Sequence, residues 1–93
     1  MTEDRETMIK RLRMRSMRRG IKEMDLILSA YADAHLADLS ADDLTLYDAL
    51  LSENDHDIYG WITGQGTAPE QYDAMMQAIT AMASGLTRPT NTA

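Results

Sequence analysis

The sequence predicts an all-α fold, a compact single-domain bundle of about five short helices. Apolar residues recur at intervals of three and four along most of the chain, and no stretch alternates with the period of two that a half-buried strand requires. Capping residues and helix-ending glycines stand between these stretches. The 93 residues, 44% hydrophobic and 26% charged, suffice for one modest core and no second one.

The first two helices are expected on either side of a break at Met17 to Gly20. Residues 8–12 show helical spacing before the break, and the same spacing continues through residues 21–35 after it. A glycine inside a helix costs about 1 kcal/mol relative to alanine. Gly20 therefore favours two helices that meet at an angle over one continuous helix.

Two further helices begin at capping signals. Ser40 stands three residues before Asp43, which is typical of a helix N-terminus, and the apolar spacing then continues to Leu51. The segment 53–57 offers a new cap before a short helix that contains Trp61. That helix is expected to end at Gly64, because glycine is favoured just past a helix C-terminus.

The last helix is expected to begin with a capping box at Thr67-Ala68-Pro69-Glu70, which has proline in the first turn. From Ser84 onward the sequence has the composition of a frayed tail. We therefore expect a helical domain over residues 1–83 and a flexible tail over residues 84–93. The apolar stripe of the last helix consists of Tyr72, Met75, Met76, Ile79 and Met82.

Composition excludes several classes of protein. The chain has no cysteine, so disulfides, thiolate catalysis and iron-sulfur ligation are ruled out. No apolar run approaches the roughly 18 residues that a membrane span needs. Acidic residues lie among the basic ones of the first turn, namely Glu3, Asp4 and Glu6, which is unlike a mitochondrial leader. We therefore expect a cytoplasmic protein with no membrane insertion.

No catalytic or metal-binding constellation stands out. The serines lack a nucleophile elbow, and the two histidines, His35 and His56, lack the spacing of metal ligands. Asp55 and Asp57 fall in a first helical turn, where carboxylates favour the helix dipole. The segment Gly64-Gln65-Gly66 is more simply a helix end than a phosphate loop. The sequence predicts no enzyme and no metal site.

Charge is distributed unevenly along the chain. Eight of the nine Lys and Arg residues lie in positions 1–22 against three acids, a net of +5, whereas residues 23–93 carry twelve acids and one base, a net of −11. This pattern suggests steering toward an acidic partner or a nucleic acid at the N-terminal end. The alternative is a basic helix that lies against the acidic remainder of the same fold.

The basic cluster leaves more than one class of function open. Arginine suits carboxylates and phosphates, so a small nucleic-acid-binding regulator is one alternative. The acidic remainder would repel a phosphate backbone, however, and no aromatic residue precedes Tyr31 to stack on bases. An adaptor for another acidic client is a second alternative. The cluster comprises Arg11, Arg13, Arg15, Arg18 and Arg19.

Two motifs together point to a specific family. Arg19-Gly20-Ile21-Lys22-Glu23-Met24-Asp25 is an Arg-Gly-x-x-Glu-x-Asp run, and Asp55-His56-Asp57-Ile58-Tyr59-Gly60-Trp61 follows about thirty residues later. The chain resembles the succinate dehydrogenase assembly factor family over residues 9–82. The family's second signature is similar to Asp-Pro-Asp-Leu-Phe-x-Trp, in which His56, Ile58 and Tyr59 replace Pro, Leu and Phe here.

The resemblance implies a five-helix monomer that is not an enzyme. Such proteins bind the flavoprotein subunit of succinate dehydrogenase, and of fumarate reductase where present, and promote covalent attachment of FAD. The FAD then belongs to the client, and this chain holds no cofactor tightly. Carried onto this sequence, Arg19 and Gly20 form the contact pair, Glu23 is the third member and Asp25 a further one, with Arg18 beside them. A glycine there permits close backbone approach by a partner.

Overall fold

The computed structural model describes residues 3–87, and over that range the chain forms helices and no strand. The all-α prediction is therefore confirmed. Five α-helices and two short 3-10 turns follow one another along the chain. They are α1 (Arg5–Ser16), α2 (Lys22–His35), η1 (Leu36–Asp38), α3 (Ala41–Leu51), α4 (Asp55–Thr63), η2 (Glu70–Tyr72) and α5 (Asp73–Thr87).

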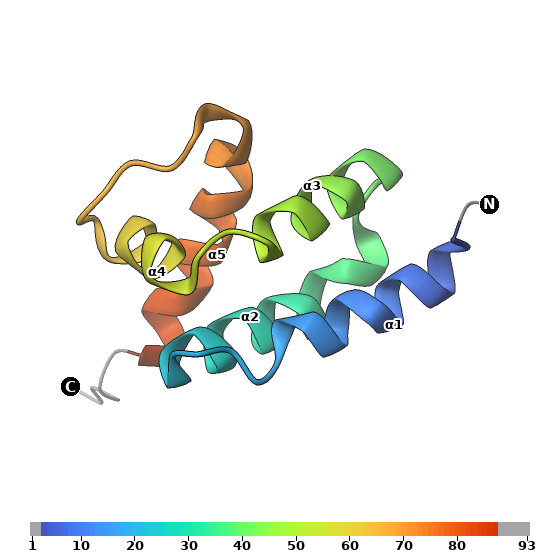
Figure 1. Ribbon diagram of the computed structural model, residues 1–93, viewed down its shortest axis with the longest axis horizontal. Helices are drawn as coiled ribbons and strands as arrows, with labels where there is room; N and C mark the ends of the chain where they lie inside the picture. Colours follow the sequence, from blue (N-terminus) through green and yellow to red (C-terminus); the bar gives the residue numbers. More distant parts are fainter. Residues whose placement is uncertain (1–2, 88–93) are drawn as a thin grey trace.

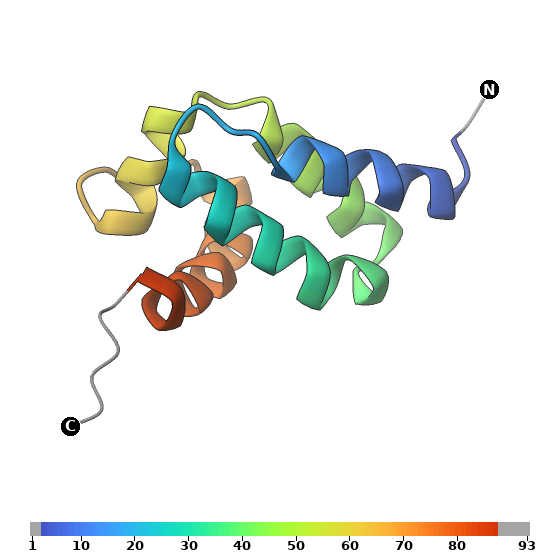
Figure 2. The ribbon, with the colours of Figure 1, turned by 90° about the horizontal axis from the view of Figure 1, so that it is seen from below.

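Helices α1 and α2 lie side by side and form one layer of the molecule (Figures 1 and 2). Helix α3 packs against α1, α5 packs against α2, and the short α4 packs against α5. The core lies between the α1–α2 layer and the other three helices. The largest side chains buried there are Tyr47, Tyr72, Leu12, Met24, Ile27, Leu28, Leu36, Leu44, Leu50, Ile58 and Ile79.

One polar pair is buried within this apolar core. Ser16 is fully buried, and its hydroxyl donates to the carbonyl oxygen of Leu12 at 2.8 Å. Its oxygen also lies 2.6 Å from the hydroxyl of Tyr47. Burial raises the pKa of Tyr47 to about 12. The pair joins the end of α1 to α3, because a buried hydroxyl must find a partner.

The break between α1 and α2 occurs where the sequence predicts it, but the left-handed residue in it is Arg18 and not Gly20. Helix α1 ends at Ser16, and Arg18 has a φ of 55°, within the left-handed region that most side chains avoid. Gly20 has no positive φ, since the only described glycine with one is Gly64. The glycine therefore needs another explanation.

Two of the predicted helix starts are confirmed and one is wrong. The side chains of Ser40 and Asn54 accept backbone N–H groups and cap α3 and α4, and Gly64, at a φ of 82°, ends α4. The expected capping box at residues 67–70 does not form. Instead Pro69 precedes the 3-10 turn η2 with no side-chain cap, and α5 begins at Asp73.

Tertiary packing explains the missing capping box. The 3-10 turn places Tyr72, which is 2% exposed, against Trp61, with ring centroids 6.2 Å apart. The Tyr72 hydroxyl also donates to Glu53 at 3.1 Å. Burying an aromatic ring of this size is worth more than one side-chain cap of about 1 kcal/mol. The chain therefore adopts the tighter turn.

The last helix extends past Ser84, where the sequence predicts the start of a tail. Helix α5 continues through Thr87, and Ala83 is buried in the core. A helix anchored by buried residues extends over Ser84 and Gly85 because each added turn needs no new nucleation. The rest of the expected tail, residues 88–93, lies outside the described residues. Among the described helices, none is long and apolar enough to cross a membrane.

Candidate partner-binding site

The two sequence motifs meet in space at the carboxylate of Asp55. The Arg19 guanidinium donates to Asp55 Oδ1 from Nε at 2.9 Å and from Nη2 at 2.6 Å. The Gly20 backbone N–H donates to the other oxygen, Oδ2, at 2.7 Å. One carboxylate at the start of α4 thus holds two consecutive residues of the α1–α2 connector. We call this arrangement the Arg19–Asp55 clamp.

The clamp is largely shielded from solvent. The Arg19 side chain is 11% exposed and the Asp55 side chain 18%. Two of the three remaining guanidinium N–H groups are also used, since Nη1 donates to the carbonyl of Arg15 at 2.9 Å and Nη2 to that of Leu51 at 3.1 Å. An arginine with its donors satisfied in this way serves the fold first. Its role is to fix the connector, residues 17–21, which carries Arg18 and Gly20 and leads into α2, where Glu23 and Asp25 lie.

The fold itself gives a steric reason for a glycine at position 20. A Cβ at this position would lie 3.2 Å from Asp55 Oδ2, which is closer than an ordinary van der Waals contact. The absence of a side chain therefore lets the carboxylate reach the backbone N–H. This requirement is independent of any partner, although Gly20 itself is exposed at the surface.

The other predicted site residues surround the clamp on the surface. Arg18 and Glu23 are exposed, and neither side chain makes a hydrogen bond or ion pair within the described part of the chain. Asp25 is half-buried and accepts from the Ser29 hydroxyl at 3.4 Å. The pairing of Arg19 with Glu23 that their spacing allows does not occur, because Asp55 takes its place. Among the predicted site residues, Arg18 and Glu23 are therefore the charged groups without a partner inside the described chain.

Sequence reasoning assigned Asp55 to the helix dipole and missed its contact with the first motif. Asp55 does lie in the first turn of α4, next to the cap residue Asn54. Its partners lie 35 and 36 residues away, so no local spacing rule reveals them. The one signal available was that both motifs occur in the same chain.

Much of the basic cluster is neutralised within the molecule. Arg11 forms ion pairs with Glu3 and Asp48, both at 2.9 Å, and Arg15 also pairs with Asp48. Arg5 donates to the carbonyls of Ala37 and Leu39. The expected basic helix against an acidic remainder is thus present in part. Within residues 3–87 the basic side chains without such contacts are Lys10, Arg13, Arg18 and Lys22.

These ion pairs predict a loss of stability in acid. Hydrogen bonds from Arg11 hold the pKa of Asp48 below its usual value of 3.8. A carboxylate whose pKa is lowered by folding stabilises the fold at pH values above its pKa in the unfolded state. This stabilisation is lost as the pH falls through its pKa in the folded state. We expect Asp48→Asn to be less stable than the wild type at pH 7, with a smaller further loss between pH 5 and pH 2 in urea unfolding. If the free energy of unfolding fell equally with pH in the variant and in the wild type over that range, this role of Asp48 would be contradicted.

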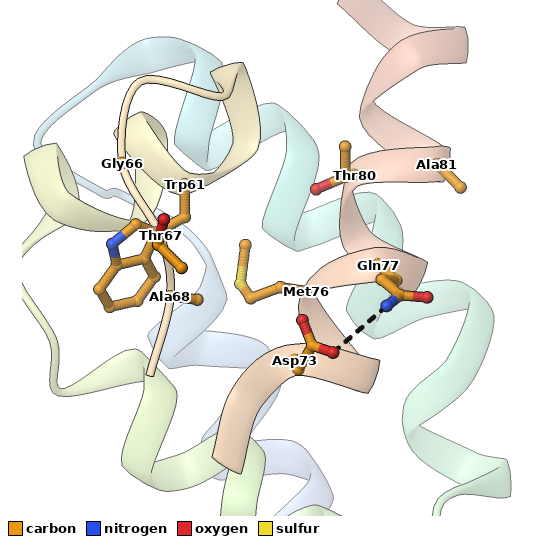
Figure 3. A pocket seen from close by; sticks show the side chains of 9 residues that line it. All are labelled: Trp61, Gly66, Thr67, Ala68, Asp73, Met76, Gln77, Thr80 and Ala81. Atoms are coloured by element: carbon orange, nitrogen blue, oxygen red, sulfur yellow. Dashed lines mark hydrogen bonds between the residues drawn. The ribbon is translucent and has the colours of Figure 1, made fainter. Parts of the chain in front are cut away.

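A separate hollow of about 480 Å³ lies between α5 and the segment that follows α4 (Figure 3). Its single carboxylate, Asp73, accepts from Gln77 at 3.4 Å. Trp61 forms one wall of the hollow and is partly buried against the core. No histidine, arginine or lysine lines the hollow. The residues described here hold no cluster of three or more potential metal ligands either.

Comparison with known proteins matches the sequence of this chain to one family. The family model described as "Flavinator of succinate dehydrogenase" matches residues 10–83, which include both motifs and every residue of the clamp. Succinate dehydrogenase assembly factor 2 of Aspergillus terreus is 49% identical over 69 residues, which cover 74% of this chain and 23% of that protein. Assembly factor 2-B of Drosophila mojavensis is 44% identical over 76 residues, which cover 80% of this chain and 48% of that protein.

The match spans half or less of those relatives, and their names correct one expectation. Both relatives are named as mitochondrial proteins, which points to a mitochondrial rather than a cytoplasmic location. The cytoplasmic prediction was wrong because it rested on acidic residues near position 1, of which Asp4 caps α1 and Glu6 lies in its first turn. On the match over residues 10–83, the chain belongs to the family of succinate dehydrogenase flavinators.

Proposed function

We propose that this chain is a non-catalytic assembly factor that binds the flavoprotein subunit of succinate dehydrogenase and promotes covalent attachment of FAD to it. The flavoprotein of fumarate reductase is a second client wherever a cell makes that enzyme. The chain acts as a monomer and contributes binding surface rather than a reacting group. The flavin remains with the client throughout.

The clamp is the observation that carries this proposal. It joins the two motifs of the family and holds the connector in a defined shape, with Arg18 in a left-handed conformation and Gly20 at the surface. The exposed side chains of Arg18 and Glu23 lie on either side of Gly20 in the sequence and have no hydrogen-bond or ion-pair partner within the described residues. Preorganised polar groups of this kind favour docking, because little conformational entropy is lost on binding.

The absence of an enzymatic role is supported by the same side chains. Arg19 and Asp55 satisfy each other, so neither is poised to transfer a proton or attack a substrate. The Gly64-Gln65-Gly66 segment does not cradle a phosphate, since the N–H groups of Gln65 and Gly66 donate to the Gly60 carbonyl. Covalent flavinylation would then use groups of the client and its FAD.

The test measures covalent flavin on the client. The flavoprotein subunit is expressed with this chain in a host that lacks its own flavinylation factor, and flavin fluorescence is read in a denaturing gel. The wild-type chain is expected to raise the fluorescent fraction above the level without it. Arg18→Asn and Glu23→Gln each remove a proposed contact with the client, and each is expected to weaken client affinity about fivefold. Asparagine suits the backbone at position 18 because it tolerates left-handed φ values.

A matched control separates client contact from general charge effects. Glu6→Gln removes the same charge from the same kind of place, an exposed glutamate in the first turn of a helix, but outside the residues that the family model matches. It is expected to leave flavinylation unchanged. Full flavinylation by folded Arg18→Asn and Glu23→Gln proteins would remove these two residues from the site. No flavinylation by the wild type would remove the proposed function.

A further inference from the structure

The α1–α2 layer exposes apolar side chains that the fold does not use. Among the described residues, the large hydrophobic side chains that remain exposed are Met14, Met17 and Leu26, at 63%, 44% and 50%. Met14 lies on α1, Met17 is the first residue after α1, and Leu26 lies on α2. Single exposed apolar residues are common on protein surfaces. Three confined to one layer mark a candidate interaction surface.

Free positive charge accompanies these apolar side chains. Lys10, Arg13, Met14 and Met17 recur at the spacing of one helical face, opposite the buried Leu12, and the exposed Glu6 lies one turn before Lys10 at the edge of this row. Arg11 and Arg15 point elsewhere, since both are paired with Asp48 of α3. On α2, Lys22 stands one turn before Leu26.

The two sets of residues belong to helices that lie side by side, and Figure 2 views this layer from below. We call the exposed surface formed by Lys10, Arg13, Met14, Met17, Lys22 and Leu26 the outer face of the α1–α2 layer. Three of its six residues are basic and three are apolar, and none of the basic ones forms an ion pair within the described chain.

We propose that this outer face docks an acidic segment of the client flavoprotein, in which aspartate or glutamate side chains flank aliphatic or aromatic ones. The inference rests on the proposed function and extends its contact beyond Arg18, Gly20 and Glu23. Methionine side chains adapt their shape to a partner, and both methionine and arginine are enriched in protein interfaces. Carboxylates of the client complement the free cations and speed its association.

Charge distribution favours a protein segment over the other anionic partners. Residues 23–93 carry a net charge of −11, which repels an extended phosphate backbone or a lipid surface reaching past the patch. A short protein segment ends within the patch and avoids that repulsion, because screening limits it to about 8–10 Å. A helix that lies on membranes also usually carries a continuous face of tryptophan, phenylalanine and leucine side chains. Here the exposed apolar residues are two methionines and a leucine.

The experiment compares polar and apolar replacements of the same two methionines. Affinity for the purified flavoprotein with FAD bound is measured by calorimetry at low and high salt. The double variant Met14→Gln with Met17→Gln is expected to bind about tenfold more weakly. The matched control, Met14→Leu with Met17→Leu, keeps the apolar surface and is expected to bind like the wild type. Lys10→Gln with Arg13→Gln is expected to bind more weakly at low salt and to lose part of the salt dependence.

The outcomes separate this inference from the proposed function. Unchanged affinity of the double glutamine variant, with the wild type binding normally, would overturn the docking face and leave the assembly function intact. Wild-type binding to anionic phospholipid vesicles or to nucleic acid that depends on Met14 and Met17 would also overturn it. The single variant Met14→Gln replaces the more exposed side chain and keeps the test valid if the double variant folds poorly. Failure of the wild type to bind the flavoprotein would remove both proposals.

Discussion

Replacing Asp55 with alanine is expected to lower the free energy of unfolding by about 3 kcal/mol, which corresponds to a fall in Tm of about 15 °C for a domain of this size. The carboxylate accepts hydrogen bonds from Nε and Nη2 of Arg19 and from the backbone N–H of Gly20. Its removal leaves a guanidinium that is 11% exposed without a counter-charge. An unpaired charge in such a position is costly because it has lost most of its hydration. Thermal and urea unfolding followed by circular dichroism measure the effect.

Asp57→Ala is the matched control for this substitution. Asp57 lies in the same first turn of α4, so its loss has the same effect on the helix dipole, but it is exposed and makes no ion pair within the described residues. Its expected effect is below about 1 kcal/mol. A double-mutant cycle with Arg19→Ala isolates the coupling between the two partners of the clamp. Equal losses for Asp55→Ala and Asp57→Ala would show that the clamp does not stabilise the fold.

Replacing Gly20 with glutamate is expected to abolish flavinylation of the client and to reduce stability by about 2 kcal/mol. The new Cβ meets Asp55 Oδ2 at 3.2 Å, and the new carboxylate repels that of Asp55. The added side chain also covers backbone that a partner would approach. The fraction of covalently flavinylated client and the unfolding midpoint are measured on the same preparation, at a temperature where the variant is folded.

Two comparisons separate the effect on the client from the effect on the fold. Asp55→Ala loosens the same connector without adding bulk, so at equal folded fraction it is expected to retain more flavinylation than Gly20→Glu. Gly60→Ala adds a methyl group where a Cβ meets nothing within 4 Å, and it is expected to stabilise α4 by up to about 1 kcal/mol. Equal flavinylation by Gly20→Glu and Asp55→Ala would assign Gly20 to the clamp alone.

The helices were predictable because their causes are local. The three- and four-residue spacing of apolar side chains specified α1, α2 and α5, and the caps at Ser40 and Asn54 and the glycine at position 64 specified where α3 begins and where α4 begins and ends. The same local rules failed at residues 67–70, because the burial of Tyr72 against Trp61 decides the turn there. The last helix was expected to end too early for a related reason. Ala83 is buried and anchors the last helix to the core, although it follows the apolar stripe predicted from the sequence.

The site was predictable only in part. The motif resemblance pointed to the segment between α1 and α2, where Arg18 and Gly20 are exposed, and their contact with a partner stays a prediction. The physical role of Arg19 was not accessible, because its partner Asp55 lies 36 residues away and was explained by its own helix. The division of the basic residues into paired and free ones depends likewise on Asp48 of α3, whose contacts with Arg11 and Arg15 no sequence rule discloses.

The hydrogen bond from the Gly20 amide also makes that residue a spectroscopic reporter. A loop amide at the protein surface normally exchanges its proton with water quickly, because nothing has to open first. The Gly20 amide is held by Asp55 at 2.7 Å, so its proton exchanges only when the carboxylate moves away. The protection of this one proton therefore measures how often the connector opens in the free protein. A client that docks on the intact connector slows the exchange further, and one that captures the open form speeds it up.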